Sequence, residues 1–316
     1  MLLVRGGSMR ITRSTSAWLA LVAASLLAGA SAAAKPQSAP QIAPSSCGRV
    51  AVPPSGNAYC SFESDGSGVV IARNSCNVKG ACLILGNAVR IGHDSCNGDA
   101  ACTEQGTVGG KSVVGDESCN AEFACAFAGG DGGYSVIGND SCNGGSETCE
   151  SAGAFGGRSV IGDGSCNDDL KACWIIGAGV GGNSVVGNNS CGGLGACAFV
   201  AQSGGVSVIG NNACNGLLAC FDTAQDPGSK SSIGNGSCNE ESSCMFVGNF
   251  GGRSVIGNGS CNGAFACEFA GSTAPNGSLI GHHSCNAAPD LSDPDLPVGI
   301  CDGNLGLVGN NRFNSW

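Results

Sequence analysis

The sequence predicts an all-β fold, a parallel β-helix (β-solenoid) of about ten coils stapled by disulfides. One observation is a unit of 20–25 residues that recurs ten times from about Val69 onwards, a period typical of stacked solenoid coils. A second is that each copy holds short β-branched runs between glycines, which favour strands and turns over helices. The third is a pair of cysteines in every copy, suited to cross-linking a thin coil.

The first predicted strand of each coil is the run Ser-Val-Ile, clearest in the copy that begins at Ser254. With that serine counted as position 1, position 4 is glycine in nine of the ten copies and position 8 is the first cysteine. Stacking is expected to place the position 3 residues in one buried column at about 4.8 Å spacing. That column consists of Ile71, Ile91, Val114, Ile137, Ile161, Val186, Ile209, Ile233, Ile256 and Ile280.

The second predicted strand starts at the second cysteine of each copy. Two residues later stands an aromatic or isoleucine residue in six copies: Ile84, Phe127, Ile175, Phe199, Phe246 and Phe269. Because alternate residues of a strand share a face, this column and the second cysteines are both expected to point inward. A glycine-rich bend then leads into the next coil.

Position 9 is asparagine in nine copies, with Gly192 as the exception. Asparagine tolerates the left-handed conformation that a sharp corner needs, so we expect it to form the corner of the coil. Its side-chain amide is also expected to bond to the next coil, which would make a ladder along the stack.

The 22 cysteines are even in number and all follow residue 34, which indicates a disulfide framework. Two pairings are open, one within each coil and one between neighbouring coils. Pairing within the coil is favoured because every copy supplies one first and one second cysteine. It gives Cys76–Cys82, Cys96–Cys102, Cys119–Cys125, Cys142–Cys149, Cys166–Cys173, Cys191–Cys197, Cys214–Cys220, Cys238–Cys244, Cys261–Cys267 and Cys285–Cys301, with Cys47–Cys60 ahead of the array.

The chain is predicted to have three parts. Residues 1–34 have the basic, apolar and small-residue regions of a secretory signal peptide, and the apolar run is too short to span a membrane. Residues 35–68 are expected to be a loose leader, rich in Pro, Ser and Ala as far as Pro54, followed by a cap over the first coil. Residues 69–316 form the solenoid, and 306–314 repeat positions 1–9 once more as a terminal half-coil.

These repeats, with their paired cysteines, resemble the secreted, cysteine-rich parallel β-helix proteins, and the disulfide-stapled coils are similar to those of β-helical insect antifreeze proteins. The resemblance covers about 245 residues and implies a stacked-coil fold. It also makes ice or glycan binding an alternative function. The antifreeze coils carry a Thr-x-Thr column, whereas the five threonines after residue 34 of this chain do not stack.

The charge of the chain bears on its partners and on metal binding. Without Arg5, Arg10 and Arg13, eleven cationic residues remain against 24 acidic ones, a net charge of −13, so nucleic acid is not expected as a partner. No cofactor is expected apart from Ca²⁺. A row of acidic residues at positions 5 and 6 of neighbouring coils is a candidate Ca²⁺ site, since bound cations would relieve the repulsion. The row consists of Asp94, Asp116, Glu117, Asp140 and Asp163.

Position 2 is the candidate binding surface. It neighbours the buried position 3 in the strand, so its side chains are expected to face outward as one stripe, unless a loop or a flattened core covers them. We call this set the valine stripe: Val113, Val136, Val160, Val185, Val208 and Val255.

The expected function is a secreted, non-enzymatic structural or adhesive protein whose partner is an extracellular glycan, a protein surface or another copy of itself. The alternative is a polysaccharide-acting enzyme on a β-helix, which would need clustered carboxylates on one face. The acidic pairs Asp168-Asp169, Glu240-Glu241 and Glu147/Glu150 lie in different coils. His93, His282 and His283 are interpreted as substitutes for asparagine at corners.

Overall fold

The computed structural model describes residues 39–47, 59–62, 68–168, 170–272, 277–286, 301 and 307–312. All of them belong to one compact unit, Ser38–Trp316. This unit is a parallel β-solenoid of about nine turns, which confirms the predicted fold class. The predicted signal peptide lies outside the described residues. Among the described residues, no helix has the length and apolar character needed to cross a membrane.

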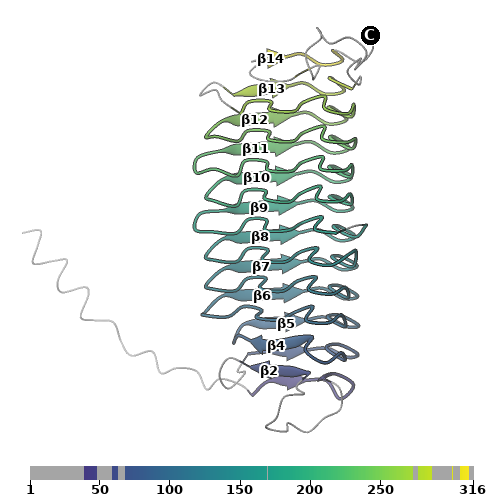
Figure 1. Ribbon diagram of the computed structural model, residues 1–316, viewed down its shortest axis with the longest axis vertical. Helices are drawn as coiled ribbons and strands as arrows, with labels where there is room; N and C mark the ends of the chain where they lie inside the picture. The colour runs from purple at the N-terminus through teal and green to yellow at the C-terminus, as the bar shows by residue number, and fades with distance from the viewer. Residues whose placement is uncertain are drawn as a thin grey trace, which may run out of the picture. The chain divides into compact units, whose positions relative to one another are not determined.

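Twelve strands form one parallel sheet along the solenoid (Figure 1). Equivalent positions pair from rung to rung, for example Val136 with Val160 and Ile137 with Ile161. In sheet order the strands are β1 (Gln41–Ile42), β3 (Val70–Ile71), β5 (Val89–Ile91), β6 (Lys111–Val114), β7 (Tyr134–Ile137), β8 (Arg158–Ile161), β9 (Asn183–Val186), β10 (Val206–Ile209), β11 (Lys230–Ile233), β12 (Arg253–Ile256), β13 (Ser278–Ile280) and β14 (Leu307–Val308).

The side chains of this sheet alternate between core and surface. Positions 1 and 3 point inward, and the position 3 column from Ile71 to Ile280 is at most 2% exposed, as predicted. Both cysteines of each repeat lie in the same core, beside small residues such as Ala124 and Ala266. The core is therefore thin, and the apolar area buried per coil is small.

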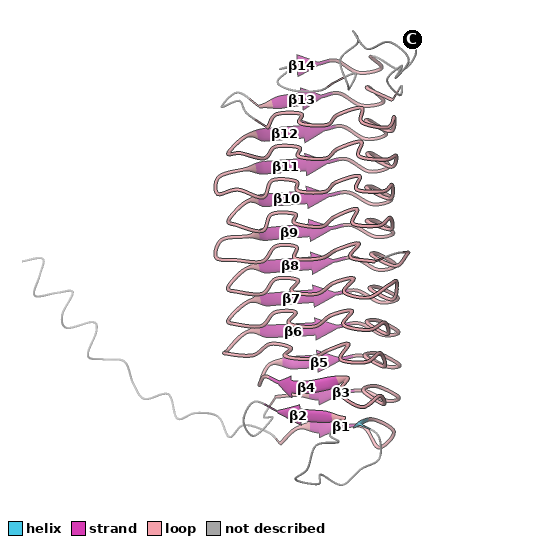
Figure 2. Ribbon diagram, in the orientation of Figure 1, coloured by secondary structure: helices cyan, strands magenta, loops and turns pink. Residues whose placement is uncertain are grey.

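Among the described residues, the second strand of the coil is formed only near the N-terminal end, where β2 (Cys60–Phe62) pairs with β4 (Cys82–Leu85). In later coils the prediction of a Cys-x-Phe strand is wrong: the chain runs there as consecutive turns (Figure 2). The residue two places after the second cysteine has φ between 53° and 60° in all nine coils from Ile84 to Phe269. A left-handed residue breaks the alternation of a strand, so this column does not enter the core, and Phe269 is 38% exposed.

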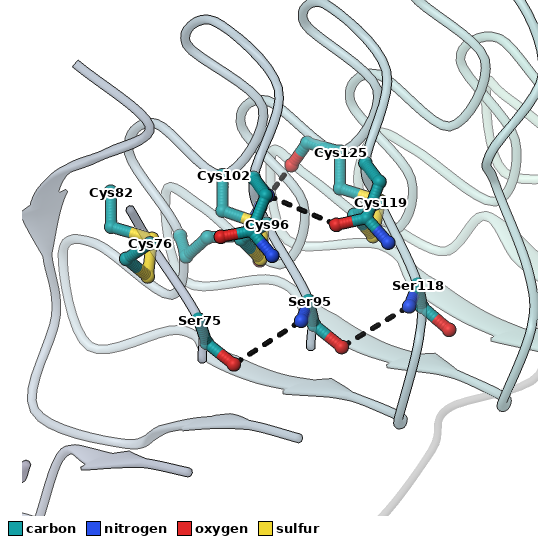
Figure 3. The surroundings of a disulfide bond; sticks show 12 residues. Ser75, Cys76, Cys82, Ser95, Cys96, Cys102, Ser118, Cys119 and Cys125 are labelled. Carbon is teal, nitrogen blue, oxygen red and sulfur yellow. Dashed lines mark hydrogen bonds between the residues drawn. A yellow bond between two sulfur atoms is a disulfide. The ribbon is translucent and has the colours of Figure 1, made fainter. Parts of the chain in front are cut away.

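Buried serines at position 7 connect the coils through a ladder that the sequence analysis missed (Figure 3). The Oγ of Ser75 accepts the backbone N–H of Ser95 at 3.2 Å and donates to the carbonyl of Gly92 at 2.6 Å. The same pattern links Ser95 to Ser118 and Gly115. Each hydroxyl thus satisfies one donor and one acceptor of the following coil in the dry core.

The asparagine ladder at position 9 is present, but it joins side chains to the backbone. The Oδ1 of Asn120 accepts the N–H of Asn97 at 3.0 Å, and its Nδ2 donates to the carbonyl of Asp94 at 3.0 Å. The prediction that the position 9 asparagine forms the left-handed corner is wrong by one residue. The first cysteine adopts it in every coil, with φ between 55° and 59°, and position 6 adopts it as well.

Every cysteine is paired within its own repeat, the pairing that the sequence favoured (Figure 3). Ten bridges span 6, 7 or 16 residues, and their Cα atoms are 5.5–5.9 Å apart. Each bridge joins the corner after the strand to the start of the consecutive turns. The disulfides therefore hold together the two sides of one coil, while hydrogen bonds hold one coil to the next.

Residues 39–47 belong to a divergent first coil, which corrects the prediction of a loose leader for these residues. Within its described part, β1 pairs with β3, Cys47 bonds to Cys60, and the N–H of Cys47 donates to the carbonyl of Ser75. At the other end β14 pairs with β13, as the predicted half-coil requires. The remaining residues of the predicted half-coil, 306, 313 and 314, lie outside the described residues.

Candidate binding face and acidic edge

The valine stripe lies on the outer face of the twelve-stranded sheet. Val113, Val136, Val160 and Val185 stand side by side on β6 to β9, in register. Val208 follows on β10, Ser232 interrupts the stripe on β11, and Val255 continues it on β12. The valines are partly exposed, up to 48% at Val255, so neither a loop nor a flattened core buries them.

Two columns of residues flank the stripe. On one side stand the first residues of the strands, among them Lys111, Tyr134 and Arg158, with the Arg158 guanidinium 5.3 Å from the centre of the Tyr134 ring. On the other side stands the position 4 glycine column. A Cβ atom on Gly210 would lie 2.6 Å from the Oδ1 of Asn235 in the next coil, so a larger residue does not fit.

The cations of this face were not singled out from the sequence. Lys111, Arg158, Lys230 and Arg253 each begin a strand and directly precede a position 1 residue, and Arg90 occupies position 2 of β5. No described strand of the large sheet contains Asp or Glu, although the chain is acidic overall. The signal was available as a basic residue before Ser in four copies.

A shallow hollow of about 360 Å³ opens on the same face near the C-terminal end. Gly277 lies there at the position that Arg253 occupies in the preceding rung. The hollow is lined by Arg253, Ser254, Val255, Gly277, Ser278, Leu279 and Leu307. It offers an apolar floor with one cation at its rim.

The acidic row lies at the turn after the strand, and its members have two different roles. Asp116 and Asp163 at position 5 accept backbone N–H groups of the preceding coil, from His93 and Asn139, both at 2.7 Å. Asn188 and Asn211 accept the same bond further along, which explains why Asp and Asn interchange at this position.

The position 6 members, Asp94, Glu117 and Asp140, are left-handed residues with φ between 51° and 54°. They and the position 5 carboxylates do not converge: among the described residues, every group of three or more potential ligands within 4.8 Å consists of cysteines. Those cysteines are all in disulfides. Calcium binding stays a prediction, without a converging set of carboxylates to support it.

The residues weighed for catalysis are spread along the solenoid. His282 uses Nδ1 to accept the N–H of Asn258 at 2.9 Å, the bond that Asn Oδ1 makes in other coils. Asp169 lies outside the described residues. Glu147 forms an ion pair with Lys171 at 2.9 Å, and Glu150 accepts a bond from the Trp174 indole at 3.2 Å.

Two carboxyl groups on the turn side have raised pKa values. Burial raises the pKa of Glu150, and the charge of Glu147 adds to this, while Trp174 and Lys171 act in the opposite direction. Burial, together with the charge of Asp226, raises the pKa of Asp222 to about 6. The Oδ1 of Asp222 is buried and has no hydrogen-bond partner in the part of the chain that the structure describes. Asp222 could not be singled out from the sequence, because its burial depends on the neighbouring coils.

Aromatic side chains from five successive coils also make a row on the turn side. Ring centres of consecutive members are 4.8–6.3 Å apart, mostly edge to face. The row consists of Trp174, Phe199, Phe221, Phe246 and Phe269. Its rings are partly buried against one another, so packing between coils accounts for them.

Comparison with known proteins matches part of the repeat array to a family but assigns no activity. Residues 47–169 match a family described as a domain of unknown function (DUF7640). The match begins at Cys47 and ends between Cys166 and Cys173, so it contains the divergent first coil and stops inside a repeat. No curated protein and no solved structure matches the chain.

Proposed function

We propose that this protein is a secreted, non-enzymatic structural or adhesive module that binds through the valine stripe. The observation that carries the proposal is the register: like side chains stand on neighbouring strands, partly exposed, between a column of glycines and a column that includes cations. A contiguous exposed apolar surface on an otherwise polar protein is typical of an interaction site. Its partner is an extracellular glycan, a protein surface or another copy of the chain.

The repetition of the stripe supports binding to a repetitive partner. Identical contacts recur one rung apart, at about 4.8 Å, so one engaged rung brings the next contact to a high local concentration. Weak contacts then add to useful avidity. The disulfides are compatible with an extracellular protein, because such bonds persist in oxidising compartments.

The test is a triple substitution, Val160→Lys, Val185→Lys and Val208→Lys, made in the full secreted protein. The fold should tolerate it, since Arg90 already occupies position 2 on β5. Binding to glycan arrays and cell surfaces, and self-association in sedimentation velocity, should fall at least about tenfold, because three charges must be desolvated at the contact.

The control carries Leu194→Lys and Leu217→Lys, at comparably exposed positions between the paired cysteines. Normal binding by the valine variant, or equal loss in the control, would refute the proposal. Degradation of a polysaccharide that stops when Glu240 and Glu241 become Gln would instead establish the enzyme.

A further inference from the structure

The glycine-rich bends before the strands form a separate edge of the solenoid, aligned from rung to rung at the left of Figure 1. Four of these bends carry an apolar side chain at the tip. Val180 is 85% exposed, Val108 65%, Phe250 62% and Phe155 52%, four of the five most exposed large apolar side chains among the described residues. We call these four residues the apolar tips.

The conformation of the tips makes these residue types unexpected. Val108 and Gly109 have φ of 51° and 78°, and a bond from the N–H of Gly110 to the carbonyl of Thr107, at 2.9 Å, closes the turn. Phe155 and Phe250 sit in the same kind of turn, with φ of 54° and 47°. Two successive positive φ values define a type I′ turn, whose first central residue is normally Asn, Asp or Gly.

The chain itself shows the ordinary solution. The bend before β7 has the same turn, with φ of 48° and 78°, and Asp131 occupies the tip. The turn therefore favours a short polar residue at its tip, whereas three bends carry there a β-branched or aromatic residue that buries little surface. An apolar residue that occupies an unfavourable turn position and buries little surface there indicates a functional role.

Cations stand directly behind the tips. Lys111, Arg158 and Arg253 each follow an apolar tip by three residues, in the pattern tip-Gly-Gly-cation, and begin the strands β6, β8 and β12. The bends between 106 and 253 that are described contain four cationic residues, with Lys230, against two acidic ones, Asp131 and Asp226. This edge is thus locally positive in a chain of net charge −10.

The spacing of the tips favours a fluid partner. The tips belong to the rungs of β6, β8, β9 and β12, so the row is about 29 Å long. Bends with polar residues, such as Asp131 before β7, separate some of its members. A protein partner would need a contiguous apolar core, and a soluble polyanion would need the cations alone. A lipid surface can surround each isolated tip while its phosphates meet the cations one residue layer behind.

We infer that this edge docks the protein peripherally on an anionic lipid surface, with the apolar tips inserted among the lipids and Lys111, Arg158 and Arg253 at the phosphates. The apolar tips lie outside the valine stripe, although the three cations border both surfaces, and the inference does not depend on binding through the stripe.

The test is co-sedimentation of the exported protein with vesicles of equimolar phosphatidylglycerol and phosphatidylcholine, and with vesicles of phosphatidylcholine alone. We expect binding only to the anionic vesicles, weakening as salt is added. The decisive variant carries Val108→Asn, Phe155→Asn and Phe250→Asn. It should bind at least about tenfold more weakly while its melting temperature stays equal or rises, because Asn suits the turn.

A second variant, Lys111→Gln, Arg158→Gln and Arg253→Gln, should lose binding and its salt dependence together. The control, Leu170→Asn, Leu194→Asn and Leu217→Asn, removes comparable apolar side chains from another edge and should bind as the wild type does. Any residual signal peptide would bind equally in all variants. The inference is overturned if the wild-type protein does not bind anionic vesicles, or if the tip variant binds them as the wild type does. It is also overturned if soluble polygalacturonate competes with the vesicles equally well for the wild type and for the tip variant.

Discussion

The strand side and the turn side of the coil differ in how strongly the stack constrains their residue types. On the strand side, from the strand to the first cysteine, side chains repeat because each pairs with its equivalent in the next rung. On the turn side, from the second cysteine to the bend, the backbone repeats but the residues vary: Phe127, Ser151 and Asp222 occupy one position with φ of 57–60°. The strand side therefore limits its sequence, while the turn side has room for variation.

The two sides are joined by the disulfides, and removing one bridge gives the largest expected effect. Cys191→Ala with Cys197→Ala opens a seven-residue loop in the middle of the solenoid and should lower the free energy of unfolding by about 2–3 kcal/mol. Hydrogen exchange should show that protection falls more at 197–205 than at β9. Equal loss on both sides would mean that the rungs, and not the bridges, hold the turn side in place.

The serine columns sharpen the comparison within the strand side. Ser165→Ala at position 7 removes a hydroxyl that accepts from the N–H of Ser190 at 3.2 Å and donates to the carbonyl of Gly187 at 2.8 Å. It should cost about 1–2 kcal/mol in denaturant unfolding, because two buried backbone groups lose a partner.

The matched control is Ser184→Ala at position 1, whose buried hydroxyl has no partner among the described residues. That change should be neutral or stabilising, since it leaves no group unsatisfied. A larger loss for Ser184→Ala than for Ser165→Ala would contradict the assignment of the ladder to position 7.

The smallest expected effect tests the turn side through pH. The pKa of Asp222 is raised from 3.8 to about 6 in the folded state, so between those values the folded protein binds more protons than the unfolded one. The contribution of Asp222 to stability consequently falls as pH rises from about 4 to 6. Asp222→Asn should match the wild type near pH 4 and exceed it at pH 8, by at most about 1 kcal/mol after allowing for solvent screening.

The measurement is the melting temperature of both proteins across that pH range. Asp226→Asn, which removes the neighbouring charge but leaves the burial of Asp222, should reproduce only part of the gain. A constant difference between wild type and Asp222→Asn at all pH values would show that the carboxyl does not titrate in this window.

Local and periodic features could be predicted from the sequence. The period predicted the solenoid, the alternation of Val160 and Ile161 predicted which column is buried, and one cysteine of each kind per copy favoured pairing within the coil. The pairing Cys47–Cys60 was predicted, but the strand at Gln41–Ile42 was missed, although Ile42-Ala43 and Ser46-Cys47 repeat the pattern of Ile71-Ala72 and Ser75-Cys76.

The tertiary structure decided what depends on contacts between coils or on backbone conformation. The first cysteine forms the corner of the coil because it is left-handed. The Phe column points outward because its left-handed residues end the alternation of the strand. The Ser ladder, the burial of Asp222 and the cations gathered behind the apolar tips arise only when coils 20–25 residues apart are stacked. A repeat in sequence determines that coils stack, but the energy of each polar or charged side chain is set by neighbours that only the stack provides.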